Sequence, residues 1–454
     1  MLVIVVIALL GFQSLMALVA PMFLILFTLV TGAMPISFTG GEMVSTPLGA
    51  MDVTAMRLLG FLLAASIVIA IKSESALKYM LIYKYHSLFL FICLLSAIYA
   101  PNLAYSVRMI SKLAGPFLLF LLVMCVVTTH KELQAMSKAI IASGILIILI
   151  ALLAKALGAN SVPGLGLTTP GMGPATFSAH IVTVGMLVLA SLVMLRRAGY
   201  AVILALIAVA TLAAFTRITI AAMFLGASSI LFFGTRGGVR FILPIVGTLA
   251  LPAVFLFNEK FRERMFKGGD KLSADQLISD PSLALDHLHG SGRFDAWSAI
   301  MVRLFEPSPI VGSGVGATQH YYYTHSATGL GAIHSEYIRL LAEVGTVGLV
   351  VFVTAMLVYL FRALENARNG DVPQGKIYSL AAVGAIVTYL IFLATDNGFD
   401  YVNQFGIYVF ALVAMSEKAR ELRLSSAGEI QLLNKAPARA GNLPKFAKID
   451  LGRR

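Results

Sequence analysis

Apolar segments long enough to cross a lipid bilayer recur along almost the whole chain, and they restrict its fold more than any other feature. They fall near residues 2–36, 57–71, 82–100, 107–127, 139–157, 176–195, 200–215, 218–233, 241–257, 340–361, 377–394 and 403–416. A helix needs about 20 mainly apolar residues to span the hydrocarbon core. Backbone groups in lipid must pair within their own segment, which favours helices, and the short alternating segments of a β-barrel are not visible. We therefore predict an all-α polytopic membrane protein.

The number of spans depends on the first apolar run. Its 35 residues, from 2 to 36, exceed one crossing, and a hairpin could form at residues 11–14 or at Ala20-Pro21. We predict about 12 transmembrane helices if this run is one broken or tilted helix, and 13 if it is two. The run lacks the basic n-region and the cleavage site of a secretory signal, so we expect a retained span.

The orientation of the spans follows from the lysines and arginines in alternate connections, because cytoplasmic loops carry the excess. One set of connections holds 12 of them: Lys72, Lys78, Lys84, Lys131, Lys138, Arg196, Arg197, Arg236, Arg240, Arg362, Arg368 and Lys376. The other set holds five: Arg57, Arg108, Lys112, Lys155 and Arg217. The first set is therefore predicted to be cytoplasmic. The net charge of +12 then reflects these loops and lipid contacts, and no nucleic acid partner is expected.

This orientation divides the chain into four predicted regions. They are a transmembrane bundle of nine or ten spans (1–257), a large periplasmic loop with short helices (258–338), three further spans (339–417) and a basic tail (418–454). The loop is 81 residues long and holds five of the eight histidines and the only tryptophan. The tail has 9 basic and 3 acidic residues, and we expect it to be disordered, cytoplasmic and close to anionic lipid.

Within the large loop, "GRFDAWSAIMVRLF" (292–305) has the apolar spacing of an amphipathic helix, and the "PSPIVGSGVGA" that follows is a glycine-rich turn. The histidine pairs His287 with His289 and His320 with His325 lack the carboxylate or cysteine pattern that completes a metal site. Cys93 and Cys125 lie within apolar runs and form no CxxC pair, so we expect small core residues. We predict no metal and no cofactor.

The stretch "GAIHSEYIRLLAEVG" (331–345) concentrates titratable residues at the start of a membrane-crossing segment. Ser335 is a predicted N-cap for a helix that begins at Glu336. Glu336, Arg339 and Glu343 share one helical face, which favours a solvated or salt-bridged stripe. His334 stands outside that stripe, beside a helix N-terminus whose dipole disfavours imidazolium. A neutral histidine there can accept a proton as a general base, and a hydrogen-bonded structural histidine is the alternative.

Several cationic residues are candidates for binding an anion on the outer face. Arg217 lies between two apolar runs, where an arginine is costly unless it faces a cavity, an anion or lipid headgroups. Arg293 follows a glycine in the large loop, and Arg108 and Lys112 lie one turn apart at a helix end. Converging guanidinium groups suit a diphosphate. The acidic residues of the first outer loop, Glu42 and Asp52, are further candidates for a base.

Three segments in order resemble the bacterial O-antigen ligase and O-antigen polymerase superfamily. They are "TRIT" (216–219), "SGRFDAW" with "PIVGSGVGA" in the large loop, and "HSEYIRLLAEVGTVGL" (334–349), in which Glu343, Gly345 and Gly348 match the family pattern. The resemblance is specific over about 215–350. It implies a metal-independent glycosyltransferase of the bacterial inner membrane that takes a glycan from undecaprenyl diphosphate. It also implies that His334 activates the acceptor hydroxyl, and that Arg217 and Arg293 bind the diphosphate.

The acceptor distinguishes the two branches of the superfamily. A ligase transfers to lipid A–core, and a polymerase transfers to another undecaprenyl-linked repeat unit. The "HSEYIR" form favours a polymerase. Glu343 and the paired glycines are expected to be structural, while Glu336, Arg339, Arg108, Lys112 and Asp52 are further site candidates. The alternative from another class is a transporter or flippase of lipid-linked oligosaccharides, although no internal repeat is visible.

Overall fold

A computed structural model describes residues 15–16, 18–32, 44–46, 49–51, 53–158, 167–169, 172–214, 216–238, 240–241, 245, 274–279, 293–325, 333–370 and 372–435. Its elements are almost all helices: α2 (Pro21–Thr31), α3 (Val53–Ile71), α4 (Ser73–Ile82), α5 (Lys84–Ser96), α6 (Leu103–Val126), α7 (His130–Ala156), α8 (Pro174–Leu195), α9 (Ala198–Ala213), α10 (Arg217–Gly234), α13 (Ala274–Ser279), α15 (Arg293–Ile300), the π-helical turn η1 (Met301–Phe305), α16 (Ala317–Thr324), α17 (Glu336–Asn369), α18 (Pro373–Thr395) and α19 (Gly406–Lys435). One small antiparallel hairpin pairs β1 (Val44–Thr46) with β2 (Gly49–Met51).

Six described helices are long and apolar enough to cross a membrane: α6, α7, α8, α10, α17 and α18. A seventh span results only if residues 58–71 of α3 and α4, which are bent by 103°, count as one. The expected number of about 12 is therefore not reached within the described part of the chain. The predicted spans at 82–100 and 200–215 are the shorter helices α5 and α9, and most of the run at 241–257 lies outside the described residues.

The first apolar run is described only in part, and its one complete helix begins at Pro21. Proline is well suited to the first turn, where its missing N–H is not needed. The Ala20-Pro21 break therefore starts a helix, and whether residues 2–36 cross once or twice lies outside the described residues.

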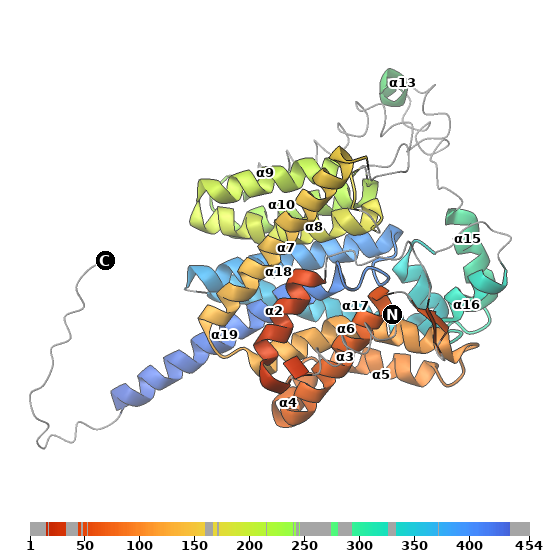
Figure 1. Ribbon diagram of the computed structural model, residues 1–454, viewed down its shortest axis with the longest axis horizontal. Helices are drawn as coiled ribbons and strands as arrows, with labels where there is room; N and C mark the ends of the chain where they lie inside the picture. Colours follow the sequence, from red (N-terminus) through yellow and green to blue (C-terminus); the bar gives the residue numbers. More distant parts are fainter. Residues whose placement is uncertain are drawn as a thin grey trace, which may run out of the picture.

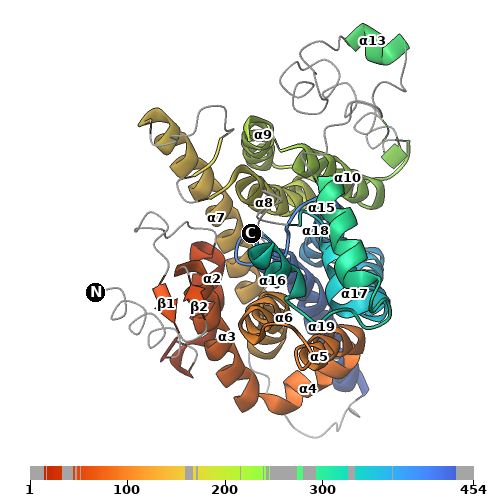
Figure 2. The same ribbon diagram turned by 90° about the vertical axis from the view of Figure 1, so that its right-hand side faces the viewer.

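Helix α18 occupies the centre of the bundle, in contact with α8, α10, α17 and α19. Figure 1 shows α8, α9 and α10 stacked along one side and α3 to α6 along the other, with α15 and α16 at one end. Seen from that end in Figure 2, α15, α16 and α17 stand together in front of the bundle. Two elements of the predicted large loop, α15 and α16, thus lie at one end of the helix bundle.

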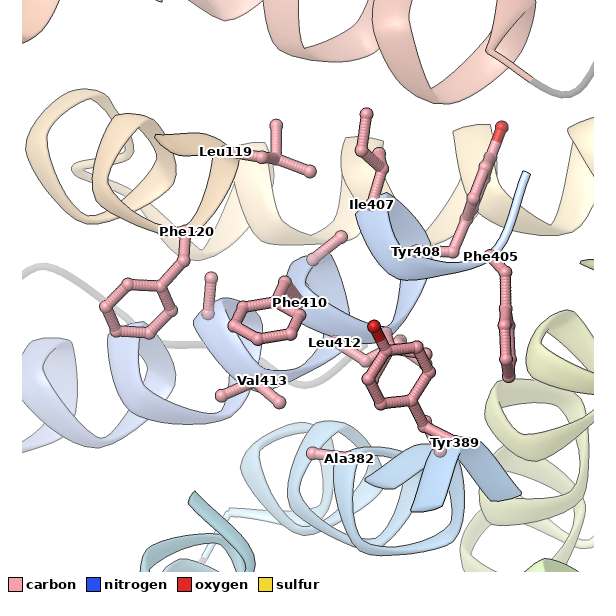
Figure 3. Packing of buried hydrophobic residues seen from close by; sticks show 14 of the residues in the cluster. Leu119, Phe120, Ala382, Tyr389, Phe405, Ile407, Tyr408, Phe410, Leu412 and Val413 are labelled. Atoms are coloured by element: carbon pink, nitrogen blue, oxygen red, sulfur yellow. The ribbon is translucent and has the colours of Figure 1, made fainter. Parts of the chain in front are cut away.

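The core between α6, α18 and α19 is built from large apolar side chains. Figure 3 shows Phe410 of α19 between Phe120 of α6 and Ala382 of α18. All three are at most 3% exposed. The two cysteines, Cys93 and Cys125, are free and buried, which confirms their predicted place in the core.

Close packing of α10 on α18 depends on small residues. A Cβ added at Gly226 would lie 2.8 Å from the carbonyl oxygen of Gly384, so the helices approach more closely than larger residues allow. Farther along, Gly234 lies against Leu380. The contact on α18 therefore moves toward its start as α10 proceeds, and the two helices are antiparallel.

The chain after Lys418 was expected to be a disordered tail, but α19 continues as far as Lys435. Two contacts anchor the turns that follow its apolar segment. Lys418 Nζ donates to the Met124 carbonyl at 2.9 Å, and the Tyr79 hydroxyl donates to Glu421 at 2.7 Å. These long-range bonds stabilise a helix that tail composition alone does not predict.

Candidate active site

His334 has a left-handed backbone, with φ at +53°, two residues before Glu336, the first residue of α17. Only His334 and Arg196 share this among non-glycine residues of the described chain. Such a conformation is costly and persists where surrounding contacts enforce it, often at functional sites. The enforcing contact is the side chain of Asn397, whose Oδ1 accepts from the His334 N–H at 2.8 Å. The predicted N-cap follows, since Ser335 Oγ accepts from the Ile338 N–H at 3.5 Å.

The imidazole of His334 lies against two polar residues that follow α18. Its Nδ1 is 3.2 Å from Asn397 Nδ2 and 3.8 Å from Asp396 Oδ1. Because Asn397 Oδ1 already accepts from a backbone N–H, its Nδ2 faces the ring as a donor. The side chain remains 28% exposed, so the ring is still reachable from outside the protein. Because Nδ1 accepts from Asn397 Nδ2, the proton of the neutral ring is on Nε2.

Asp396 is held in place by groups of its own turn. Its Oδ1 accepts from the Asn397 N–H at 2.8 Å and from the Tyr401 hydroxyl at 3.1 Å. Burial raises the pKa of Tyr401, and the adjacent Asp396 raises it further, so the phenol remains a donor. Asp396 is only 6% exposed. The carboxylate therefore has a fixed position beside the imidazole.

Helix α15 brings Arg293 to the same turn. Arg293 Nη1 donates to the carbonyl oxygen of Thr395, the last residue of α18, at 2.9 Å. Four residues later, Trp297 Nε1 donates to the carbonyl of Ile333, directly before His334, at 2.6 Å. The predicted amphipathic helix at 292–305 thus exists as α15 and η1. Its Arg293 and Trp297 side chains bind the end of α18 and the residue before His334. Its apolar face is not completely covered, because Phe294 is 53% exposed.

Arg217 is the first residue of α10, whose antiparallel partner α18 ends at Thr395. Thr388 Oγ1 donates to the Ala222 carbonyl at 3.3 Å, five residues from the start of α10. Continuing that register places Arg217 level with the end of α18. The three residues singled out from the sequence, His334, Arg293 and Arg217, therefore belong to one end of the bundle, around residues 395–397.

The charged face of α17 is salt-bridged and buried, so the solvated form of that expectation is wrong. Glu336 is fully buried, and Arg339 and Glu343 are 7% and 2% exposed. The Arg339 guanidinium lies 3.2 Å from Glu336, without hydrogen-bond alignment, and 3.0 Å from Asp400. Lys112 Nζ adds a contact of 2.5 Å to the same Asp400 carboxylate. The spacing of these residues along the helix shows that they share a face. It cannot show that tertiary packing buries that face against other parts of the protein.

This ion network fixes the turn that carries Asp396 and Asn397. Glu336 Oε1 accepts from the Phe399 N–H at 2.9 Å, while Asp400 bridges Arg339 and Lys112. Partial burial would raise the pKa of Asp400, but the two cations hold it well below its usual range. Asp400 therefore stays ionised as the anionic centre of the network. Lys112 is engaged here, and nothing in this geometry frees it for a diphosphate.

Helix α17 is broken at Gly345, and the glycine-rich turn of the large loop fills the break. Gly345 has φ +68°, and a Cβ there would lie 2.2 Å from the Ile310 carbonyl oxygen. The Thr346 N–H donates to the Pro309 carbonyl at 2.9 Å, and the Gly314 N–H donates to the Glu343 carbonyl at 2.9 Å. Glu343 also accepts from the Thr318 N–H and hydroxyl. Glu343 and Gly345 are structural, as expected, but Gly345 supports a loop insertion and not simple helix packing.

The remaining candidates are placed less informatively. Arg108 lies over the Tyr105 ring at 6.0 Å on α6, the helix that carries Lys112. Asp52 and Glu42 lie outside the described residues. Sequence reasoning missed Asp396, Asn397 and Asp400, although "TDNGFDY" (395–401) is a polar interruption between two apolar runs. The two carboxylates within that interruption could have marked it as a candidate site.

A known family matches the central part of this chain. No curated protein matches the chain. Residues 175–353 match the model of the family described as O-antigen ligase, a range that includes Arg217, Arg293 and His334. The match supports a glycosyltransferase of the ligase or polymerase type that uses lipid-linked and acceptor glycans. It confirms that this chain resembles the O-antigen ligase and polymerase superfamily over its central region.

Proposed function

We propose that this protein is a glycosyltransferase of the bacterial inner membrane. It transfers a glycan from undecaprenyl diphosphate to a sugar hydroxyl at the periplasmic face. The observation that carries the proposal is the position of His334, in a strained backbone at a helix start, between Asn397 and the fixed carboxylate of Asp396. Arginines from two other helices belong to the same end of the bundle.

In the proposed step, the acceptor hydroxyl attacks the anomeric carbon of the donor sugar. The new bond joins that carbon to the acceptor oxygen, and the bond from the carbon to the diphosphate oxygen breaks. His334 takes the hydroxyl proton on its unprotonated ring nitrogen, and Asp396 stabilises the imidazolium through its charge, since 3.8 Å is too long for a hydrogen bond. The electron pair leaves with undecaprenyl diphosphate, whose charge Arg217 and Arg293 stabilise.

The buried network supports this step indirectly. Glu336, Arg339 and Asp400 hold the Asp396 turn against the start of α17, so the base and its carboxylate keep their relative position. Preorganisation of this kind is worth more than any single contact, because the groups need not reorganise during reaction. We therefore assign positioning roles to these three residues and to Lys112.

The decisive experiment is transfer by the purified full-length protein in detergent. It is given an undecaprenyl-diphosphate-linked glycan and an acceptor, and the product is identified by mass spectrometry. Turnover that His334→Asn abolishes supports the enzyme. A transporter or flippase of lipid-linked glycans is the second candidate, and binding of the donor without any product would favour it.

The acceptor is expected to be a growing repeat unit, so we favour a polymerase of O-antigen or exopolysaccharide. The basis is the "HSEYIR" form of the histidine motif. A ligase acting on lipid A–core is the alternative. Glycan profiling of a deletion strain separates them, since single repeats survive on lipid A–core without a polymerase, whereas loss of a ligase removes all glycan from it.

A further inference from the structure

The opposite end of the bundle carries a second polar pocket that the transfer reaction does not use. Helix α18 has 23 residues and is therefore about 34 Å long, so its start lies one bilayer core away from Thr395. At that start, a pocket open to solvent is lined by residues of α7, α17, α18 and α19. In Figure 1 the end of α19 projects from this end of the bundle, away from α15 and α16.

The charged side chains that line this pocket are arginines. His130, Arg420 and Arg423 face it from two different helices. One Arg423 N–H donates to the Asn369 carbonyl, and Arg420 lies 3.9 Å from the half-exposed Glu365, so neither guanidinium is fully engaged. The nearby Glu417 carboxylate is already paired with Arg362 at 2.7 Å. Fixed positive charge therefore exceeds negative charge among the described residues of the pocket.

The first turn of α18 also has backbone N–H groups that receive no side-chain cap, beside the same pocket. Its N-cap, Val372, provides no side-chain acceptor, and Gly375 of the first turn lines the pocket. N–H groups and the helix dipole at such a position favour an anion. Asp371, the preceding residue in sequence, lies outside the described residues.

An independent feature points to a ligand. Asn366 lines the pocket and is only 4% exposed, yet its Oδ1 has no hydrogen-bond partner among the described residues. Its Nδ2 donates to Ser416 and to Glu417, which fixes which amide atom is unsatisfied. A buried acceptor without a partner is costly, and a hydroxyl or protonated phosphate oxygen would satisfy it.

We propose that this pocket binds a phosphate group, carried by an anionic lipid headgroup or free in solution. Two guanidinium groups and the first turn of α18 hold the phosphate oxygens, and Asn366 accepts from a hydroxyl of the ligand. The site lies at the level of a membrane interface, where a headgroup is present at high local concentration. This inference does not depend on the transfer reaction.

Thermal unfolding of the purified full-length protein tests the proposal. Cys93 and Cys125 are buried, so a thiol-reactive fluorophore reports their exposure on unfolding. The protein is compared in neutral detergent alone, with phosphatidylglycerol, with diacylglycerol of the same chains, and with inorganic phosphate against chloride of equal ionic strength. Phosphatidylglycerol should raise Tm by about 2–4 °C, and diacylglycerol should not.

Two variants test whether the stabilisation arises in this pocket. Arg420→Gln with Arg423→Gln removes the cations. Gly375→Asp adds a carboxylate where a Cβ meets only Ala419 at 4.0 Å, and an acid in a first turn favours the helix, so this chain should fold. Both should lose the Tm rise, while Gly375→Asn and the exposed Lys84→Gln should retain it.

The outcomes separate the sources of phosphate. A response to the lipid alone assigns a headgroup, and an equal response to inorganic phosphate assigns a free ion. No stabilisation of the wild-type protein by either form would overturn the proposal. So would an equal rise in the wild-type protein and in Gly375→Asp.

Discussion

Asn397 binds His334 twice, since its Oδ1 accepts from the backbone N–H at 2.8 Å and its Nδ2 lies 3.2 Å from the ring Nδ1. The two residues are 63 positions apart, His334 just before α17 and Asn397 just after α18, and they meet at the same end of this helix pair. One side chain thus sets both the left-handed backbone of the histidine and the direction of its ring. This relationship makes the position of the proposed base a property of the tertiary fold.

Replacement of Asp396 by asparagine should slow transfer by about 10- to 100-fold. The new amide oxygen can still accept from Tyr401 and from the Asn397 N–H, so the turn should keep its shape. The loss of charge removes about 1.5–3 kcal/mol of stabilisation from the imidazolium formed on proton uptake. The measurement is the initial rate of glycan transfer, with the exposed Asp295→Asn of α15 as the matched control. A normal rate in Asp396→Asn at normal protein level would remove the carboxylate from the mechanism.

Arg217→Lys and Arg293→Lys should each slow transfer although the charge is kept. Lysine cannot make the planar two-pronged contact with phosphate oxygens. Loss of one charge-assisted bond costs about 2–3 kcal/mol, or roughly 30- to 150-fold in rate. Arg303→Lys, exposed in η1, controls for the substitution itself. The diphosphate assignment fails if both variants turn over at the rate of this control.

Gly345→Ala should destabilise the protein strongly. A Cβ at this position meets the Ile310 carbonyl, and φ of +68° with ψ of −174° costs about 1–3 kcal/mol for a residue other than glycine. Gly199→Ala is the control, because its Cβ would meet nothing within 4 Å inside α9. Thermal unfolding in detergent should show a lower Tm for Gly345→Ala alone. Equal Tm values would mean that the loop does not depend on the break in α17.

A cysteine at Asp275 in α13 tests the predicted orientation. Twelve basic residues in one set of connections against five in the other predict a periplasmic loop. Cys93 and Cys125 are buried, so labelling of the new thiol should stand out. A membrane-impermeant reagent added to cells with a permeabilised outer membrane should label it. Labelling only after the inner membrane is opened would invert the topology.

Much of the fold was accessible from the sequence because bilayer-length hydrophobicity is a local property. Helices occupy the described apolar runs, and the start of α17 at Glu336 with Ser335 as its cap follows from residue chemistry alone. The number of spans was less predictable, since the 103° bend between α3 and α4 depends on packing. The helical extension of α19 to Lys435 depends in the same way on distant partners.

The residues of the candidate site also differ in whether local sequence could identify them. His334 and Arg293 could be singled out by their place in the chain and by their motifs. Asp396 and Asn397 could not, because only the packing of α18 beside α17 brings them to the histidine. The burial of Arg339 between Glu336 and Asp400 was equally hidden, since helical periodicity says which residues share a face but not what covers it.

The most direct test of the account compares His334→Asn with Glu336→Gln in one transfer assay with purified protein. Asparagine tolerates the left-handed backbone of His334, so the variant should fold and insert normally. It should nevertheless lose roughly 10²- to 10⁴-fold in rate, the usual contribution of a positioned general base. Glutamine keeps the acceptor for the Phe399 N–H, so Glu336→Gln should stay within about tenfold of the wild-type rate. An active His334→Asn beside an inactive, folded Glu336→Gln would assign the base to the carboxylate and contradict the account.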